Sequence, residues 1–352
     1  MPDALKKILE KEPVRAEAPC RVDMGGTVDM PALHYAIRNM DTLTFNIAVG
    51  MRTKITLLPH KAGFVKVSST GFDSAEYPED KAPFIGHPLG LMFAVAAFFR
   101  ASGVHITVES GSPVRSALGG SSAAVVALVA AFSKAYERLG ERALSIRQVV
   151  LLSHGIESNT AGVPCGLQDQ LAAAYGGVNA WYWHPTASGP GYDKRSVISP
   201  KDYAAFNERL LLAYCGSPHD SIDVNSVWVR EFLRGTTRDK WITMCRHAVD
   251  FVEALSRKDY AEAAAFMNKE VAIRREMTPN VLTPIMEKLV DTAVENGCGG
   301  RFTGAGAGGC VWALGEKGAL AKVKVEWDEI LSSAETARLL PITVDGQGVL
   351  VD

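Results

Sequence analysis

The chain has 352 residues, of which 47% are hydrophobic and 22% charged, and its formal net charge is -2. This composition is ordinary for a globular protein and lacks the basic blocks typical of nucleic-acid binding, so we expect no nucleic-acid partner. The longest apolar run, 89–99, is too short to span a bilayer, and residues 1–14 lack a signal-peptide hydrophobic stretch. We therefore expect a cytoplasmic protein with no membrane partner, and a chain of this length suggests two domains.

Residues 1–14 are expected to be a polar helix or a loose tail. In the first part of the chain, Thr, Ile and Val alternate in segments that predict strands: 42–50, 52–58, 65–68, 104–108 and 178–183. Helices are expected between them: 89–102, about 120–139, 146–157 with Ser145 as N-cap, and 171–175. Residues 184–200 hold several Pro and Gly, so we place a domain boundary near their end, which gives domains 1–200 and 201–352.

The second part begins with an expected strand at 210–214. Helices are predicted to follow it at 221–232, 240–255, 260–277 and 284–295, and further strands at 309–314 and 337–344. Helices follow pairs of strands rather than alternating with them strictly. We therefore expect an α+β fold rather than a doubly wound sheet.

The six cysteines form no C-x-x-C pair, and no pair of histidines lies near them at metal-binding spacing. They are expected to be reduced thiols, mostly small core residues. A structural zinc site is therefore not expected.

Residues 113–124, Pro-Val-Arg-Ser-Ala-Leu-Gly-Gly-Ser-Ser-Ala-Ala, join the expected strand 104–108 to the alanine-rich helix. This layout presents free backbone N–H groups and the positive end of the helix dipole to an anion. Glycines let a phosphate approach the backbone, and a serine hydroxyl can reach a metal bound to that phosphate. The loop is neither a Walker A sequence nor a dinucleotide fingerprint. The alternative is that Ser121 or Ser122 is only the N-cap of an ordinary core helix.

Three other stretches carry candidate chemistry. Residues 301–310 hold four glycines in six positions, which would let the backbone lie against a ligand; the alternative is a simple hairpin loop. Residues 18–31 place Arg21 and two aspartates around a Gly pair. The arginine could bind a phosphate and an aspartate could accept hydrogen bonds from hydroxyl groups. The alternative is a turn that contains an internal Arg–Asp ion pair. Glu157 and Asp169 could converge to bind a hard cation and accept a proton, or could be solvated loop carboxylates.

In this order, the four stretches resemble the GHMP kinase superfamily (galactokinase, homoserine kinase, mevalonate kinase and phosphomevalonate kinase) from residue 18 to 314. The central loop is similar to the motif P-x-x-x-G-L-G-S-S-A: Pro113, Leu118, Gly119 and Ser121 match, whereas Ala117 and Gly120 replace a Gly and a Ser. The run Thr-Gly-Ala-Gly at 303–306 is similar to the third family motif. The Gln-Asp-Gln at 168–170 and the form of the 21–29 stretch resemble sugar kinases of heptose kinase and fucokinase type more than mevalonate kinases.

This resemblance implies an N-terminal domain like domain 2 of ribosomal protein S5, a ferredoxin-like C-terminal domain, and ATP held between them. It implies that Asp169 is the base or orienting carboxylate and that Arg21 neutralises charge on the transferring phosphoryl group. The expected ATP-binding residues are Ala117, Leu118, Gly119, Gly120, Ser121, Ser122, Ala123, Gly304 and Gly306. The expected substrate-binding residues are Asp29, Gly26, Thr27 and Gln168, and the expected Mg²⁺ ligands are Ser121, Ser122 and Glu157.

The resemblance thus implies an ATP- and Mg²⁺-dependent sugar kinase that phosphorylates the anomeric C1 hydroxyl of a hexose or heptose, of galactose, fucose or heptose-phosphate type. Two alternatives stay open: a mevalonate-type isoprenoid alcohol kinase, and a non-catalytic relative that binds ATP or a sugar. If the acceptor is a sugar phosphate, Arg38, Arg52 and Arg301 are candidates to bind its phosphate, or are surface charges. The sequence makes no prediction of oligomeric state.

Overall fold

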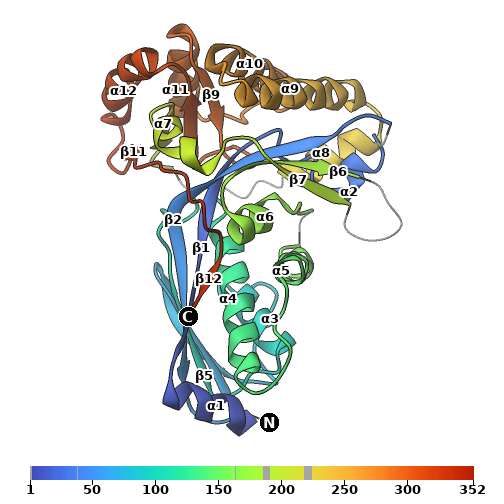
Figure 1. The fold of residues 1–352 in the computed structure, drawn as a ribbon, viewed down its shortest axis with the longest axis vertical. Helices are drawn as coiled ribbons and strands as arrows, with labels where there is room; N and C mark the ends of the chain where they lie inside the picture. The colour runs from blue at the N-terminus through green and yellow to red at the C-terminus, as the bar shows by residue number, and fades with distance from the viewer. Residues whose placement is uncertain (1, 38, 163, 185–190, 218–223) are drawn as a thin grey trace.

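The computed structural model describes residues 2–37, 39–162, 164–184, 191–217 and 224–352, which form two β-sheets with helices packed against them (Figure 1). In this part of the chain the larger sheet has eight strands: β1 (Val14–Met24), β2 (Leu43–Pro59), β3 (Phe64–Ser69), β4 (Phe72–Pro78), β5 (Val104–Glu109), β6 (Val178–Trp183), β7 (Tyr192–Ser196) and β12 (Leu350–Val351). The smaller sheet has four: β8 (Leu210–Tyr214), β9 (Gly299–Phe302), β10 (Cys310–Leu314) and β11 (Arg338–Leu340). The separate sheets, antiparallel except for the β3–β5 pair, confirm the expected α+β class.

Strand β2 organises the larger sheet. Its 17 residues replace the two strands expected at 42–50 and 52–58. One half of β2 pairs with β6 and the other half with β5, while β1 pairs along both halves. The register between β1 and β2 shifts at Pro19/Cys20, so a bulge bends the ribbon without ending the strand.

Helices α3 (Gly90–Phe98) and α4 (Gly120–Glu137) lie along one face of the larger sheet, and α5 (Ile146–Thr160) packs against these helices farther from the sheet (Figure 1). Every residue of α4 from Ser122 to Ser133 is buried, because small alanine and valine side chains let the helix lie deep against the sheet. Helix α5 begins with the expected N-cap: Ser145 and Gln148 form a reciprocal capping box. The remaining helices on this part of the chain are α1 (Pro2–Lys11), α2 (Pro31–His34) and α6 (Gln168–Tyr175).

The smaller sheet carries its own helices at the other end of the molecule (Figure 1). The short elements before it are the 3₁₀ turn Pro200–Asp202 and α7 (Tyr203–Asn207). The longer helices are α8 (Val224–Leu233), α9 (Arg238–Ser256), α10 (Tyr260–Met277), α11 (Pro284–Glu295) and α12 (Lys317–Leu331). The predicted helices at 240–255, 260–277 and 284–295 are confirmed, while the first three residues of the helix expected at 221–232 lie outside the described residues.

The end of the chain returns to the larger sheet, where β12 pairs with β1. Before it, Asp345 exchanges backbone hydrogen bonds with Ala48 and Gly177, and Arg52 forms an ion pair with its carboxylate. The strand expected at 337–344 is shorter, Arg338–Leu340, because Pro341 has no N–H to continue the ladder. The larger sheet therefore contains a strand from each end of the described chain.

All six cysteines are free thiols, as expected. Of the helices that the structure describes, none has the length and apolar character required to cross a bilayer.

Candidate active site

A cavity of about 470 Å³ lies where β1, the 110–119 loop and the beginnings of α4 and α6 meet the 304–305 loop. Most residues predicted from the sequence line it: Arg21, Thr27, Asp29, Ala117, Leu118, Gly119, Gly120, Ser121, Ser122, Glu157, Gln168, Asp169 and Gly304. Segments separated by almost 300 residues along the chain therefore contribute to one cavity.

The loop before α4 has an unusual backbone. Gly119, the N-cap residue of α4, has φ +75°, and Ala117 has φ +58°, a conformation that favours glycine. This positive φ explains why the family motif has a glycine at the position of residue 117. Ala117 adopts the same φ with some backbone strain. Because α4 begins here, its first amides lack intrahelical partners and are free for an anion.

Ser121 and Ser122 do not cap α4. Their hydroxyls donate to Oε1 of Glu157 at 3.2 and 3.0 Å, and Gln170 Nε2 donates to Oε2 of the same residue at 2.6 Å. Burial raises the pKa of Glu157 to about 7, and the nearby Asp169 acts in the same direction. The carboxylate and two hydroxyls form an oxygen-only donor set at the first turn of α4.

These donors fit a magnesium ion. Mg²⁺ binds through one or two carboxylates and takes its remaining ligands from phosphates and water. A bound cation would also offset the cost of ionising the buried Glu157 carboxyl. The described residues hold no cluster of three His, Cys, Asp or Glu side chains able to bind a metal by themselves, so such an ion would depend on the phosphates of a nucleotide.

Arg21 and Asp169 form a bidentate ion pair inside the cavity. Arg21 Nε donates to Asp169 Oδ1 at 2.7 Å and Nη2 to Oδ2 at 3.0 Å, while Nη1 donates to the carbonyl of Ala117 at 2.6 Å. Burial alone would lower the pKa of Arg21, but the carboxylates of Asp169 and Asp23 raise it above its ordinary value. A Cβ at Gly119 would lie 3.0 Å from Asp169 Oδ2, so this glycine lets the pair approach the loop.

Asp29 and Gln168 also line the cavity. Asp29 Oδ2 accepts a hydrogen bond from the Gln168 amide at 2.9 Å, whereas its Oδ1 and Gln168 Oε1 are buried and receive none from the described part of the chain. Burial raises the pKa of Asp29 to about 7. Any side chain at Gly166 would collide with Asp29, because a Cβ there would lie 1.7 Å from Oδ2. Buried oxygens without donors suit the hydroxyl groups of a ligand.

Three predicted residues lie outside the cavity lining. Ala123 is buried within α4, and Gly26 packs beside Gln168, where a Cβ would meet its amide nitrogen at 2.8 Å. Gly306 faces Val281: a Cβ would lie 2.5 Å from that carbonyl, and φ is +77°. Gly304 does adjoin the central loop, with the Ala117 carbonyl 3.4 Å from its Cβ position.

Replacing Gly306 with Val is therefore expected to lower folding stability and not only nucleotide affinity. A β-branched residue fits poorly at positive φ and would push against the Val281 carbonyl. Urea unfolding compared with titration of Mg·ADP separates the two effects. Wild-type stability combined with weak nucleotide binding would contradict this account of Gly306.

No sequence motif predicted the apolar part of the cavity lining, which consists of Phe72, Leu89, Met92, Val108 and Val114. Of the three arginines considered for an acceptor phosphate, Arg38 lies outside the described residues. Arg52 is paired with Glu17 and Asp345, and Arg301 is buried in a charged cluster. Neither is a surface charge, and neither lines the cavity.

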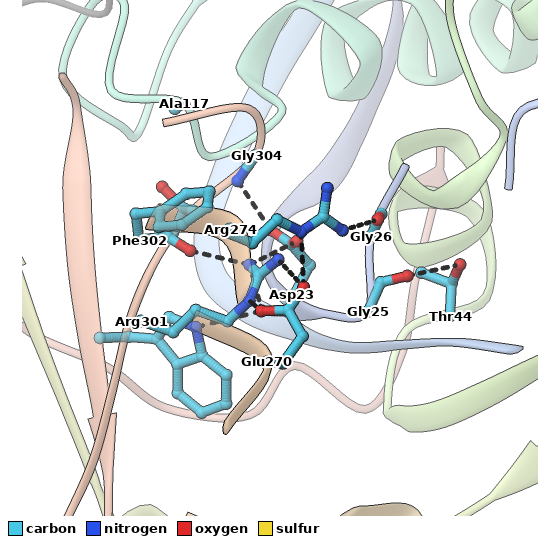
Figure 2. Close-up of polar contacts among 12 residues, drawn as sticks. Asp23, Gly25, Gly26, Thr44, Ala117, Glu270, Arg274, Arg301, Phe302 and Gly304 are labelled. Carbon is cyan, nitrogen blue, oxygen red and sulfur yellow. Dashed lines mark hydrogen bonds and ion pairs between the residues drawn. The ribbon is translucent and has the colours of Figure 1, made fainter. Parts of the chain in front are cut away.

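The charged cluster around Arg301, consisting of Asp23, Glu270, Arg274 and Arg301, is shown in Figure 2. All four side chains are almost fully buried. Arg301 pairs with Asp23 Oδ2 at 2.9 Å and with Glu270 Oε2 at 3.0 Å, and Arg274 pairs with Glu270 Oε1 at 2.8 Å. The cluster joins β1 to β9 and α10, so it links the two sheets.

Comparison with known proteins identifies the family. The model of the GHMP kinases N terminal domain matches residues 90–177, and that of the GHMP kinases C terminal region matches residues 251–332. The chain belongs to the GHMP kinases. The two sheets described above form the two-domain fold of this family, whereas the domain boundary expected near residue 200 stays a prediction.

A D-glycero-alpha-D-manno-heptose 7-phosphate kinase of Campylobacter jejuni is 28% identical over 212 residues, 57% of this chain and 58% of that protein. A mevalonate kinase of Aeropyrum pernix is 25% identical over 342 residues, 94% of this chain and 97% of that protein. The galactokinase of Lactococcus lactis, solved with galactose, superposes with a TM-score of 0.74 at 16% identity, covering 99% of this chain and 98% of that one. The chain spans little more than half the length of the first curated relatives it matches.

Proposed function

We propose that this GHMP kinase transfers the γ-phosphate of ATP to a sugar hydroxyl, with the anomeric C1 hydroxyl of a hexose or heptose as the acceptor position. The observation that carries the proposal is the Arg21–Asp169 ion pair, which lies between the loop before α4 and the hydroxyl-accepting end of the cavity. The heptose 7-phosphate kinase among the relatives supports a sugar as the acceptor.

On the donor side, the backbone of residues 117–122 binds the ATP phosphates through free amides at the start of α4. Gly304 lets the second glycine-rich segment lie against that loop. Glu157, Ser121 and Ser122 would hold Mg²⁺, and such an ion would neutralise negative charge on the phosphates. Arg21 then places a fixed positive charge where negative charge develops during transfer.

On the acceptor side, Asp29 and Gln168 present unpartnered oxygens to the sugar hydroxyls, with Gly26 and Thr27 shaping the adjoining loop. Asp169 accepts the proton of the attacking hydroxyl or orients it. Each carboxylate oxygen can accept more than one hydrogen bond, so the contacts with Arg21 leave room for this hydroxyl. Arg21 fixes the direction of the Asp169 carboxylate through two hydrogen bonds.

A screen of ATP consumption over free hexoses, heptoses, their phosphates and mevalonate tests the proposal. Turnover with a sugar or sugar phosphate is the expected result. The mevalonate kinase relative makes an isoprenoid alcohol the second candidate acceptor, and turnover with mevalonate alone would replace the sugar. ATP binding without turnover on any acceptor would favour a non-catalytic binding protein.

Replacing Ser121 with Ala is expected to raise the Mg²⁺ concentration needed for turnover while leaving stability close to wild type. Ser121 is exposed at the cavity, so its loss leaves Ser122 and Gln170 to satisfy the buried Glu157. Ser122→Ala is the matched comparison: Ser122 is 4% exposed, and its loss removes a buried hydrogen bond worth about 1 kcal/mol. Turnover measured against Mg²⁺ concentration, with thermal melts, checks both variants. Unchanged Mg²⁺ dependence in Ser121→Ala would remove this residue from the metal site.

Replacing Asp29 with Asn should change how stability depends on pH. The native pKa of Asp29 is about 7, so between about pH 4 and pH 7 the folded state binds a proton that the unfolded state has released. The proton bound to Asp29 in the folded state therefore adds to the free energy of unfolding at low pH, and this stabilisation is lost as the pH rises through 7. Asn resembles the neutral carboxyl, so the variant should become more stable relative to wild type at high pH.

Urea unfolding at about pH 5 and about pH 8, without nucleotide, measures this difference. Asp291→Asn, at a surface ion pair with Arg275, is the control and should show no comparable trend. A difference between Asp29→Asn and wild type that does not vary with pH would contradict a protonated Asp29.

A further inference from the structure

The buried cluster of Asp23, Glu270, Arg274 and Arg301 ends at two loops of the cavity. At one end, Asp23 Oδ1 accepts a hydrogen bond from the Gly304 amide at 2.8 Å. At the other end, Arg274 Nη2 donates to the carbonyl of Gly26 at 2.8 Å (Figure 2). A continuous chain of charged hydrogen bonds therefore connects the loop that holds Gly304 with the 25–27 loop, which precedes Asp29.

The cluster is electrically balanced, since two carboxylates face two guanidinium groups. Burial alone would raise the pKa of Glu270, but Arg301 and Arg274 lower it to about 2, so the pairs are ionised. Buried ion pairs seldom add net stability compared with well-packed apolar side chains. Where such pairs are present, their directional hydrogen bonds can fix one arrangement of the groups they join.

Arg274 is held rigidly at its position on α10. Its guanidinium carbon lies 4.5 Å from the ring centres of both Trp228 and Trp241, and Nε is bonded to Glu270. Aromatic faces stabilise a guanidinium and restrict its movement. The donor directed at Gly26 therefore comes from a fixed point of the C-terminal domain.

The 25–27 loop has little freedom to move without disturbing the cavity. Gly25 lies so close to α9 that a Cβ would be 2.8 Å from that of Ala248, and its φ is +66°. At Gly26 a Cβ would be 2.5 Å from Asp23 Oδ2 and 2.8 Å from Gln168 Nε2. A shift of Gly26 therefore displaces the side chain of Gln168, the residue whose backbone N–H donates to Asp29 Oδ2.

We propose that Arg274 is a positioning residue that fixes the 25–27 loop, and through it Asp29 and Gln168, relative to the nucleotide loop at Gly304. The role in catalysis rests on the proposed kinase function, whereas the role in holding the loop does not. Because a misplacement of about 1 Å can cost about 10²-fold in rate, the loss of one loop anchor is expected to matter for turnover.

Arg274→Lys is the most direct variant. Lysine keeps the positive charge opposite Glu270, but a single ammonium cannot reproduce the planar fork that reaches both Glu270 and Gly26. Arg274→Met removes the charge and the hydrogen bonds to Glu270 and Gly26 together, so its effect on the 25–27 loop should be larger than that of Arg274→Lys. Arg209→Met is the matched control, because Arg209 also lies over an aromatic ring, Tyr260, and pairs with a carboxylate, Glu316, away from the cavity.

Hydrogen exchange of the full chain with bound Mg·ADP measures the loop directly. In Arg274→Lys we expect amides 25–29 to exchange at least about tenfold faster, with exchange at 117–124 and Mg·ADP affinity unchanged. In the sugar assay, the specificity constant for the sugar used by wild type should fall about 10- to 100-fold, while the KM for ATP stays within about twofold. Arg209→Met should show none of these changes.

Unchanged exchange at 25–29 in both Arg274 variants would overturn the proposal. Equal acceleration in every segment would also overturn it, because that pattern indicates general destabilisation. If wild type fails to turn over any sugar while the exchange pattern holds, the proposed function fails and the positioning of the loop stands.

Discussion

Replacing Asp169 with Asn is expected to lower turnover by at least about two orders of magnitude in a protein that folds and binds nucleotide. The two side chains have nearly the same size, so packing at the start of α6 should persist. The substitution removes both the negative charge and the capacity to take a proton. It also changes the group that orients Arg21, and the two losses are not additive.

Steady-state rates, Mg·ADP titration and thermal melts of both proteins check this prediction. A small loss of stability is expected, because Arg21 is 5% exposed and keeps only Asp23, at 3.7 Å, as a charged partner. Asp193→Asn, at an exposed pair with His184, is the control and should keep wild-type turnover. If Asp169→Asn stays within a few-fold of wild type, Asp169 has no part in the reaction.

The second large effect is expected on stability, from Arg301→Met. This change leaves Asp23 with only the longer charged contact to Arg21, at 3.7 Å, and Glu270 with Arg274 alone among the described residues, in almost fully buried surroundings. Breaking a buried ion pair by removing one partner costs about 3–5 kcal/mol, because the remaining charge is buried and uncompensated. The free energy of unfolding should fall by that amount.

Urea unfolding followed by circular dichroism measures the loss. Arg195→Met, which removes an exposed pair with Glu253, should change stability by less than about 1 kcal/mol. A similar small change for Arg301→Met would show that the cluster tolerates unpaired charge, and would weaken the case for its rigidity.

The sequence predicted the parts of the cavity lining that belong to short local motifs. The loop before α4, the 168–170 run and the 303–306 run each combine glycines or carboxylates at fixed spacing, and the structure brings residues of all three to one cavity. Helices with clear apolar periodicity, such as α9 to α11, were likewise predicted nearly to their ends.

Strand β1 was not predicted, and its composition explains why. Its sequence alternates apolar and charged residues on both sides of Pro19, but a proline argues against a strand interior, and Arg21 and Asp23 are buried instead of facing solvent. Strand β9 contains two glycines and was also missed.

The charged cluster could not be predicted from the sequence for a different reason. Glu270 and Arg274 are four residues apart on α10, a spacing that ordinarily indicates a surface pair. Their burial depends on Asp23 and Arg301, which are 278 residues apart in sequence. Only the tertiary fold shows that these four residues meet, and that Gly306 faces Val281 instead of the cavity.

Transfer of labelled phosphate from γ-³²P-ATP to an acceptor tests the central claim most directly. Wild type and Asp169→Asn are incubated with Mg²⁺ and each of the hexoses, heptoses, their phosphates and mevalonate, and the products are separated. The account predicts a labelled sugar phosphate with wild type, at least about 100-fold less with Asp169→Asn, and release of the label by acid as expected for an anomeric phosphate. Label found only in mevalonate, or in no acceptor while Mg·ADP binds, would contradict it.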